Sequence, residues 1–370
     1  MTAFAEEAAT AAMTAAPLAD RRRRMGFLVI YVAAAVAVIA FVASVAVGPL
    51  DIRMGDVVAI LLQPFGVSPR PGITVVEIGV VQSIRLPRAL LGAAMGAALG
   101  TAGAAMQGFF RNPLAEPGLV GVSAGGALAA VAVIVLGGTV LAGLTASLGT
   151  FALPLAAFSG SLIAIFLIYR LSVLEGRVIV ATMLLAGVAA NALAFSGIGY
   201  LTFLADDTQL RDLTFWTLGS LGGATWARIL PAGVMLIVAV AGLLTLSRPM
   251  NALLLGEDEA MTLGVDVERL KRRAAFMTAL GVGAATAVCG IVNFVGLVVP
   301  HLVRLMTGPD HRYVLPGSAL MGAALVLISD IIARLAVSPA ELPLGVITAA
   351  IGAPFFFWLL VRDKRRSQLG

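Results

Sequence analysis

Few side chains in this 370-residue sequence are arranged for covalent chemistry, and the clearest arrangement is Gly121-Val122-Ser123-Ala124-Gly125. A G-x-S-x-G pattern is typical of serine hydrolases, in which a strained strand-to-helix turn exposes the serine beside a base and an oxyanion hole. Here the pattern opens an apolar stretch, where small residues favour helix packing. The one histidine inside an apolar segment is His301, and no acidic partner for it is evident. The pattern therefore indicates packing and not hydrolysis.

Metal and proton chemistry have little more support. The chain contains two histidines and one cysteine, Cys289, so a closed protein metal site is not expected. We expect His301, which follows Pro300, to bond within an irregular helical segment. Asp330 is an ionisable residue inside an apolar segment, which raises the hypothesis of a proton relay. Arg334 follows one helical turn later, so a structural ion pair explains Asp330 equally well.

The sequence also lacks a phosphate-binding loop, which requires the pattern G-x-x-x-x-G-K-[ST]. Neither of its two lysines, Lys271 and Lys364, is preceded by glycine. If ATP drives this protein, ATP and Mg²⁺ bind to another polypeptide. We therefore expect this chain to carry no cofactor and not to be an enzyme.

Composition indicates a membrane protein. The chain is 60% hydrophobic and 12% charged, with a mean hydropathy of +1.01 and 41 glycines, unlike an ordinary soluble domain. Its formal charge of +5 is explained by arginines in cytoplasmic loops, since such loops of membrane proteins are enriched in basic residues. We therefore expect membrane lipid, and no nucleic acid, among its partners.

Hydrophobic length predicts ten membrane crossings. A helix needs about 20 apolar residues to span a hydrocarbon core about 30 Å thick. Nine stretches fit: 27–48, 89–107, 118–138, 148–169, 178–204, 229–247, 274–293, 315–333 and 342–361. The apolar run that begins at Ala274 continues to Met306, too far for one crossing, so we expect a break near Asn293–Gly296 and a short tenth span over 296–307. Ten crossings return both basic ends of the chain to the same side, the cytoplasm.

Three further segments complete this organisation. Residues 1–24 are rich in alanine and are expected to form a disordered cytoplasmic tail before a single membrane domain, 25–366. Gly92, Gly96, Gly100 and Gly108 recur at multiples of four residues, a spacing that lets helix backbones approach closely. The segment 248–273 is the largest cytoplasmic element, with Gly256 and Gly264 as natural ends of short helices. We interpret this segment either as a docking surface for a soluble partner or as a solvated connector.

Several longer motifs resemble one family. They are RLPR, MQGFFRNPLAEPGLVGVSAGG, LLLGEDEAMTLGVDV, GLVVPHLVRLMTGPDHRYVLPG and ELPLGVITAAIGAPFFFWLL. From about residue 27 to 362 the chain is similar to the FecCD-type membrane subunits of ABC importers for iron complexes and cobalamin. The resemblance implies an all-α, ten-span permease of the type II ABC importer class in the bacterial inner membrane. It also implies a homodimer with two ATPase subunits and a periplasmic substrate-binding protein.

The resemblance further implies roles for individual residues. In such a permease Arg85, Arg88 and Arg334 match arginines that pair with glutamates of the binding protein, although contact with lipid headgroups, or pairing of Arg334 with Asp330, would also account for them. The coupling segment that contacts the ATPase corresponds to Leu254, Leu255, Glu257, Glu259, Leu263 and Gly264.

The transport path is expected at the dimer interface, with Met183 and Asn191 of the 178–204 span as lining residues. Haem is the expected cargo, because the chain looks most like haem permeases, and a ferric siderophore or cobalamin is the alternative. An ion-coupled secondary carrier is a remote alternative that would need no ATPase.

Overall fold

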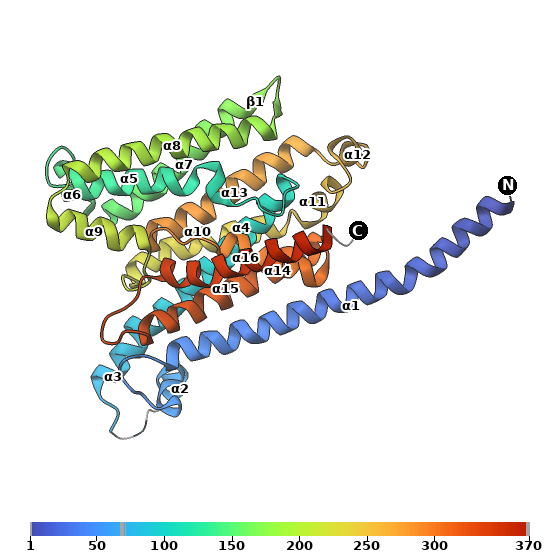
Figure 1. The fold of residues 1–370 in the computed structure, drawn as a ribbon. Helices are drawn as coiled ribbons and strands as arrows, with labels where there is room; N and C mark the ends of the chain where they lie inside the picture. Colours follow the sequence, from blue (N-terminus) through green and yellow to red (C-terminus); the bar gives the residue numbers. More distant parts are fainter. Residues whose placement is uncertain (1, 67–69, 71, 368–370) are drawn as a thin grey trace.

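The computed structural model describes residues 2–66, 70 and 72–367, and this part of the chain is almost entirely helical (Figure 1). Its ten long helices fall on the ten predicted spans. They are α1 (Thr2–Ala46), α4 (Leu86–Phe109), α5 (Val122–Leu136), α7 (Ala152–Ser172), α8 (Val180–Leu204), α10 (Trp226–Leu244), α13 (Val267–Cys289), α14 (Val295–Thr307), α15 (His311–Leu335) and α16 (Leu344–Ser367). Among the described residues, six helices have the length and hydropathy to cross a membrane, and α5, α14 and part of α16 are shorter apolar helices. The predicted all-α membrane fold is confirmed.

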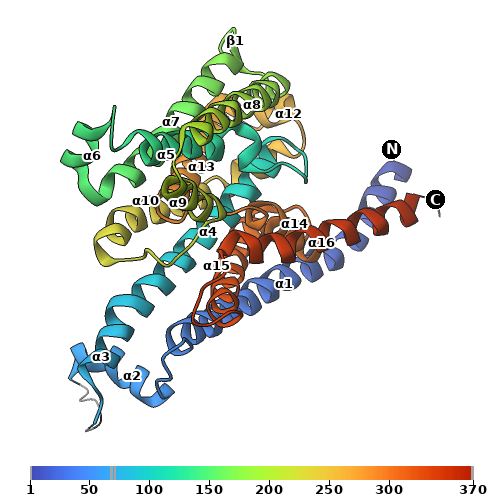
Figure 2. The ribbon, with the colours of Figure 1, turned by 60° about the vertical axis from the view of Figure 1, so that its left-hand side comes forward.

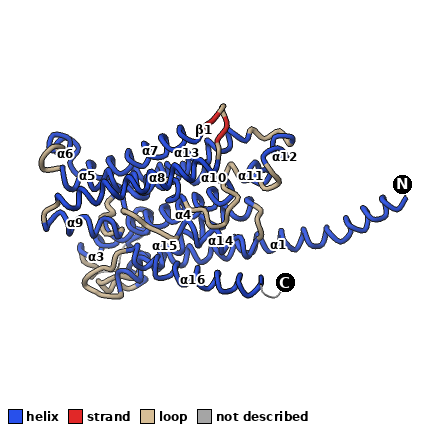
Figure 3. Tube along the Cα trace, turned by 45° about the horizontal axis from the view of Figure 1, so that its top comes forward, coloured by secondary structure: helices blue, strands red, loops and turns tan. Residues whose placement is uncertain are grey.

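The short elements gather at the two ends of the bundle. At one end lie α2 (Met54–Leu62), α3 (Val75–Gly79), α6 (Ala142–Leu148) and α9 (Asp207–Leu218) (Figure 1). At the other end lie α11 (Ser247–Leu253), α12 (Glu257–Thr262) and an antiparallel hairpin of β1 (Val173–Leu174) and β2 (Arg177–Val178), drawn red in Figure 3. Both ends of the chain emerge on this α11–α12 side (Figure 1), as an even number of crossings requires.

The remaining short turns lie between these elements. They are η1 (Gln63–Phe65), the π-helical turn η2 (Val80–Arg85) that leads into α4, η3 (Pro117–Val120) and η4 (Gly149–Phe151). The loop after α4, which contains Pro113, leads into η3 at Pro117, and η3 leads into α5.

The N-terminal segment continues the first span. Residues 2–24 form the first half of α1, which runs without a break through the expected boundary at residue 24 and projects beyond the bundle (Figure 1). Alanine has the highest helix propensity of all residues, so an alanine-rich segment attached to a stable span extends that span's helix. Residue 1 of the predicted tail lies outside the described residues.

The long apolar run after Ala274 is divided as predicted. α13 ends at Cys289, and α14 begins at Val295 after a turn in which Gly290 (φ 78°) and Phe294 (φ 68°) adopt left-handed backbone conformations. These two residues redirect the chain, because a continuous helix cannot include φ values above zero. A run too long for one crossing therefore supplies two helices.

Helix α4 is the centre of the bundle. Figure 2 shows it between a group that contains α5, α7, α8, α10 and α13 and a second group that contains α1, α14, α15 and α16. A Cβ atom added at Gly96 would overlap the carbonyl oxygen of Gly322, and one at Gly100 would overlap that of Ser318, both on α15. The small residues of α4 thus bring two backbones into direct contact, as their spacing predicts.

Candidate functional site

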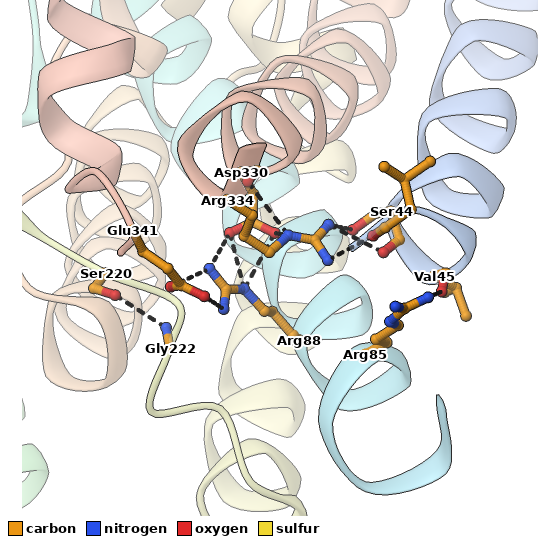
Figure 4. Close-up of polar contacts among 10 residues, drawn as sticks. Ser44, Val45, Arg85, Arg88, Ser220, Gly222, Asp330, Arg334 and Glu341 are labelled. Atoms are coloured by element: carbon orange, nitrogen blue, oxygen red, sulfur yellow. Dashed lines mark hydrogen bonds and ion pairs between the residues drawn. The ribbon is translucent and has the colours of Figure 1, made fainter. Parts of the chain in front are cut away.

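At the α2–α3 end of the bundle, Arg88 on α4 bridges two carboxylates (Figure 4). Its Nε and Nη2 donate to Asp330 Oδ1 at 3.0 and 2.8 Å, and its Nη1 and Nη2 donate to the two carboxylate oxygens of Glu341 at 2.8 and 2.9 Å. Asp330 lies on α15, and Glu341 lies in the loop before α16. The pair with Glu341 is bidentate, a geometry that adds both strength and orientation to a contact between arginine and carboxylate. Arg88 therefore fastens the loop before α16 to the core of the bundle.

The other two arginines close the end of α1. Arg334 approaches Asp330 at 3.1 Å and donates to the carbonyl oxygens of Ser44 and Val47 at 3.0 Å each. Arg85 donates to the carbonyl oxygen of Ala46 at 2.6 Å and also to those of Val45 and Leu50. The last carbonyl groups of a helix lack partners within the helix, and cationic side chains satisfy them here.

This network changes the interpretation of the three arginines. Arg85, Arg88 and Arg334 are each less than 10% exposed, and every one of them is bonded within the chain. None of them presents a free guanidinium to a partner in this conformation, so direct pairing with glutamates of a binding protein is not available without rearrangement. Asp330 lies between two arginines, which supports the structural ion pair and not the proton relay.

At the opposite end, the segment 248–273 contains the short helices α11 and α12, where the sequence predicts short helices with Gly256 and Gly264 at their ends. Gly256 (φ 136°) precedes α12 and Gly264 (φ 82°) follows it, so glycine permits both changes of direction. Leu255 and Leu263 are 64% and 63% exposed, whereas Leu254 is half-buried. Two leucines in open solvent at one end of a compact bundle indicate a surface that a partner covers.

The acidic residues of α12 divide into two kinds. Glu259 is exposed, as expected of a residue that contacts a partner. Glu257 instead pairs with the buried Lys271 at 2.8 Å, so its carboxylate is already engaged within the chain. Contact of Glu257 and Glu259 with the ATPase stays a prediction, and Glu257, whose side chain is 43% exposed, would make that contact while paired with Lys271.

A second contact holds α11. Asn251 accepts a hydrogen bond from the backbone amide of His311 at 2.8 Å and donates to Asp310 Oδ1 at 2.6 Å. Although partial burial opposes its ionisation, hydrogen bonds from Arg312 and Asn251 keep the pKa of Asp310 below its ordinary value. Residues 248–273 are thus fixed to the bundle by specific polar contacts and are not a loose connector.

Similarity to known proteins identifies the family of this chain. Residues 36–362 match the FecCD transport family. The chain belongs to this family.

Characterised relatives of this FecCD protein are permeases. The haemin transport system permease of Yersinia pestis is 45% identical over 285 residues, which cover 77% of this chain and 84% of that protein. A cobalamin import permease of Halobacterium salinarum is also 45% identical over 285 residues, covering 77% of this chain and 74% of that protein. A vitamin B12 import permease of Vibrio parahaemolyticus is 40% identical over 305 residues, covering 80% and 87%.

A solved structure gives the same result for the fold. A transporter described as a metal-chelate type ABC transporter, in an inward-facing conformation, aligns with a TM-score of 0.76 and 29% identity, over 90% of this chain and 98% of that one. The FecCD protein is therefore the permease subunit of an ABC transporter and not an enzyme; the family's ATPase is a separate subunit.

Of the two residues predicted to line the pathway, Met183 is fully buried within the FecCD protein. Asn191 is half-buried and donates from its amide to the carbonyl oxygen of Gly118 at 3.1 Å. Asn191 thereby holds α8 against the loop that precedes α5, and a lining role for Met183 and Asn191 stays a prediction.

The hydrolase and metal patterns have packing explanations in the FecCD protein. Ser123 lies in the first turn of α5, and a Cβ atom added at Gly125 would contact the backbone of Gly160 on α7. His301 on α14 lies edge-on to Phe355, with ring centroids 6.1 Å apart. In the described part of the chain, no three His, Cys, Asp or Glu side chains gather as metal ligands would.

Sequence reasoning missed two residues that organise these sites, Glu341 and Lys271. Their charges were visible in the sequence, but their partners were not. Glu341 lies 253 positions from Arg88 along the chain, and Lys271 lies 93 positions from Val178.

Proposed function

We propose that this chain forms, as a homodimer, the membrane pathway of an ATP-driven importer whose cargo is haem. The observation that carries the proposal is 45% identity over 285 residues with a haemin permease. A cobalamin permease matches equally over the same length, so cobalamin is the second candidate. A ferric siderophore is supported by the family resemblance alone. All three cargoes are large metal chelates, and no covalent step on the cargo is required of this chain.

The α11–α12 surface supports docking of a separate ATPase. Leu255, Met261 and Leu263 provide exposed apolar side chains, and Asp258 and Glu259 add exposed carboxylates beside them. Interfaces of this kind combine an apolar centre with a polar rim. The ATPase would hold ATP and Mg²⁺, and two copies would serve the two permeases of the dimer. Since the chain ends lie on the same side, this arrangement makes both termini cytoplasmic in the inner membrane.

The arginine network supports a role at the periplasmic end. Arg88 and Arg334 join α1, α4, α15 and the loop before α16, and so shape the surface that a substrate-binding protein would contact. If a glutamate of that protein pairs with Arg88, it must displace Glu341, whose side chain is 35% exposed, and not Asp330, which is 2% exposed. Docking through Arg85, Arg88 and Arg334 thus requires an opening of this network.

Reconstituted transport tests the proposal. Proteoliposomes that contain this permease and its ATPase are expected to import haem only with ATP and the haem-loaded binding protein. Import that depends on the cobalamin-loaded protein would change the cargo, and import driven by a proton gradient alone would revive the secondary carrier.

A matched pair of variants tests the ATPase surface. L255D is expected to abolish co-purification of the ATPase, because it adds a charge to the apolar surface. V75D, at the opposite end, where Val75 is 86% exposed, is expected to retain the ATPase. If both variants retain the ATPase equally, α11–α12 is not the docking surface.

A further inference from the structure

Lys271 is a buried cation with partners from several elements. It lies in the second turn of α13, its side chain is 2% exposed, and its Nζ lies 2.8 Å from Glu257 Oε2 and 3.4 Å from Glu268 Oε1. The same Nζ donates to the carbonyl oxygen of Val178 at 3.1 Å. A buried ammonium is strongly unfavourable unless its hydrogen bonds are satisfied, so this geometry is specific and not incidental.

These contacts join the coupling element to the hairpin. Glu257 is the first residue of α12, and Val178 is the last residue of β2, two positions before α8 begins. The backbone amide of Val178 donates to Glu268 Oε2 at 3.0 Å, so both polar groups of its backbone belong to the cluster. Figure 3 shows the hairpin and α12 at the same end of the molecule. Lys271 therefore lies where the start of α12 and the start of α8 meet.

Beside this contact α12 and the hairpin are separated by a recess. The recess is open to solvent and is lined by Arg177 of the hairpin, by Glu257, Asp258 and Met261 of α12, and by residues 264–268. Glu257 and Glu268 approach each other there as like charges, and the ammonium of Lys271 is the group that holds both. Without this ammonium, repulsion between the two carboxylates would favour movement of α12 away from Glu268 and from Val178, to which Glu268 is hydrogen-bonded.

We propose that Lys271 is a positioning residue that makes α12 and the hairpin move as one body, so that displacement of α12 by the ATPase reaches α8. The inference deepens the proposed function and rests on it. Since α8 follows β2 after a single residue, Ile179, a shift of Val178 is passed directly to the first turn of α8. Loss of the ammonium uncouples the two movements but leaves the surface that binds the ATPase intact.

The test uses the full complex of permease, ATPase and binding protein in lipid. Spin labels are attached to cysteines at Glu175, in the hairpin turn, and at the exposed Thr262 of α12, which is not among the apolar residues of the docking surface, while the native Cys289 is buried. The distance between the labels is measured by pulsed EPR with and without an ATP analogue. In the parent protein we expect one distance in both states. In K271M we expect the distance between the labels to change when the ATP analogue binds. We also expect K271M to hydrolyse at least about fivefold more ATP per imported substrate than the parent protein, because coupling between two sites typically changes an equilibrium by at least about fivefold.

Two variants accompany K271M. R269M removes a cation from the same helical turn, but Arg269 is 69% exposed and pairs with Asp266, so coupling should be unchanged. E257Q should give the same nucleotide-dependent distance and the same raised ATP ratio as K271M. If K271M does not assemble with the ATPase, E257Q alone tests the coupling. A constant distance and an unchanged ATP ratio in both E257Q and K271M would overturn the inference, as would a nucleotide-dependent distance in the parent protein. Failure of the parent complex to assemble or hydrolyse ATP would instead contradict the proposed function.

Discussion

At the scale of single residues, Arg88 lies between a carboxylate that is buried and one that reaches solvent. Asp330 is 2% exposed and also contacts Arg334, whereas Glu341 is 35% exposed and belongs to a loop. A buried charge pair contributes little compared with a well-packed apolar alternative, but removal of one partner leaves a charge without compensation. The network therefore specifies how α4, α15 and the loop before α16 fit together.

Replacement of Arg88 tests this role. R88M is expected to reduce the free energy of unfolding by about 3–5 kcal/mol, because it leaves buried carboxylate charge poorly compensated. The measurement is equilibrium unfolding in mixed micelles with increasing denaturing detergent. R70M is the control, since Arg70 pairs with Asp56 but is 61% exposed, and its loss should cost about 1 kcal/mol or less. Equal losses in the two variants would show that the Arg88 network does not organise the fold.

Glu116 predicts a specific pH dependence. It lies in the loop between α4 and α5, where burial raises the pKa of its carboxyl group, and a hydrogen bond from the backbone of Phe294 opposes that rise only in part. A carboxyl group whose folded-state pKa is raised favours the folded state below its ordinary pKa of 4.5. That contribution is lost as pH rises through the folded-state value.

Replacement of Glu116 by glutamine should remove this dependence. As pH rises from 5 to 8, the thermal midpoint of the parent protein is expected to fall relative to that of E116Q, which carries no titratable group at this position. The midpoints are followed by tryptophan fluorescence in lipid nanodiscs. D207N, a change at the exposed Asp207, should retain the behaviour of the parent protein. A parent protein that gains stability relative to E116Q over this range would contradict the assignment.

At the scale of elements, the contact of α4 with α15 is set by glycine. G96A is expected to reduce the free energy of unfolding by about 1–3 kcal/mol, because the added methyl group overlaps the backbone of Gly322. Gly233 of α10 has open space where its Cβ would lie, so G233A should leave stability unchanged or slightly higher. Both are measured by the same detergent unfolding. A G96A protein as stable as G233A would mean that the two helices can separate without cost.

The long helices of this protein could be predicted because a helix that crosses a membrane needs about 20 apolar residues. The ten spans and the break before Val295 follow from apolar length and basic flanks, and the presence of short helices near Gly256 and Gly264 follows from these glycines. The extent of α1 could not be predicted, since an alanine-rich segment suits both a tail and a helix. The partners of Arg88 and Lys271 could not be predicted either. The sequence shows that a residue is charged, but it does not show which oppositely charged residue the fold places beside it.

At the scale of the whole molecule, α8 combines a large exposed surface with a lower hydropathy than the other strongly exposed long helices. It is the least buried of the six long apolar helices among the described residues, yet its mean hydropathy is lower than that of α7 and α10. Its exposed face includes Ser196, Gly199 and Tyr200 beside apolar side chains. Polar side chains in membrane helices face other protein or water-filled space. This face therefore suits the second copy of the chain and the path between the copies.

Cross-linking tests this arrangement. With a short bifunctional maleimide in native membranes, S196C is expected to give a covalent dimer, because two copies of α8 face each other across the path. I237C is the control, since Ile237 is 65% exposed on the more apolar α10 and should face lipid. ATP should alter the rate for S196C, because import requires the path to open and close alternately. Dimers from I237C with none from S196C would put α10 at the interface and leave α8 in lipid.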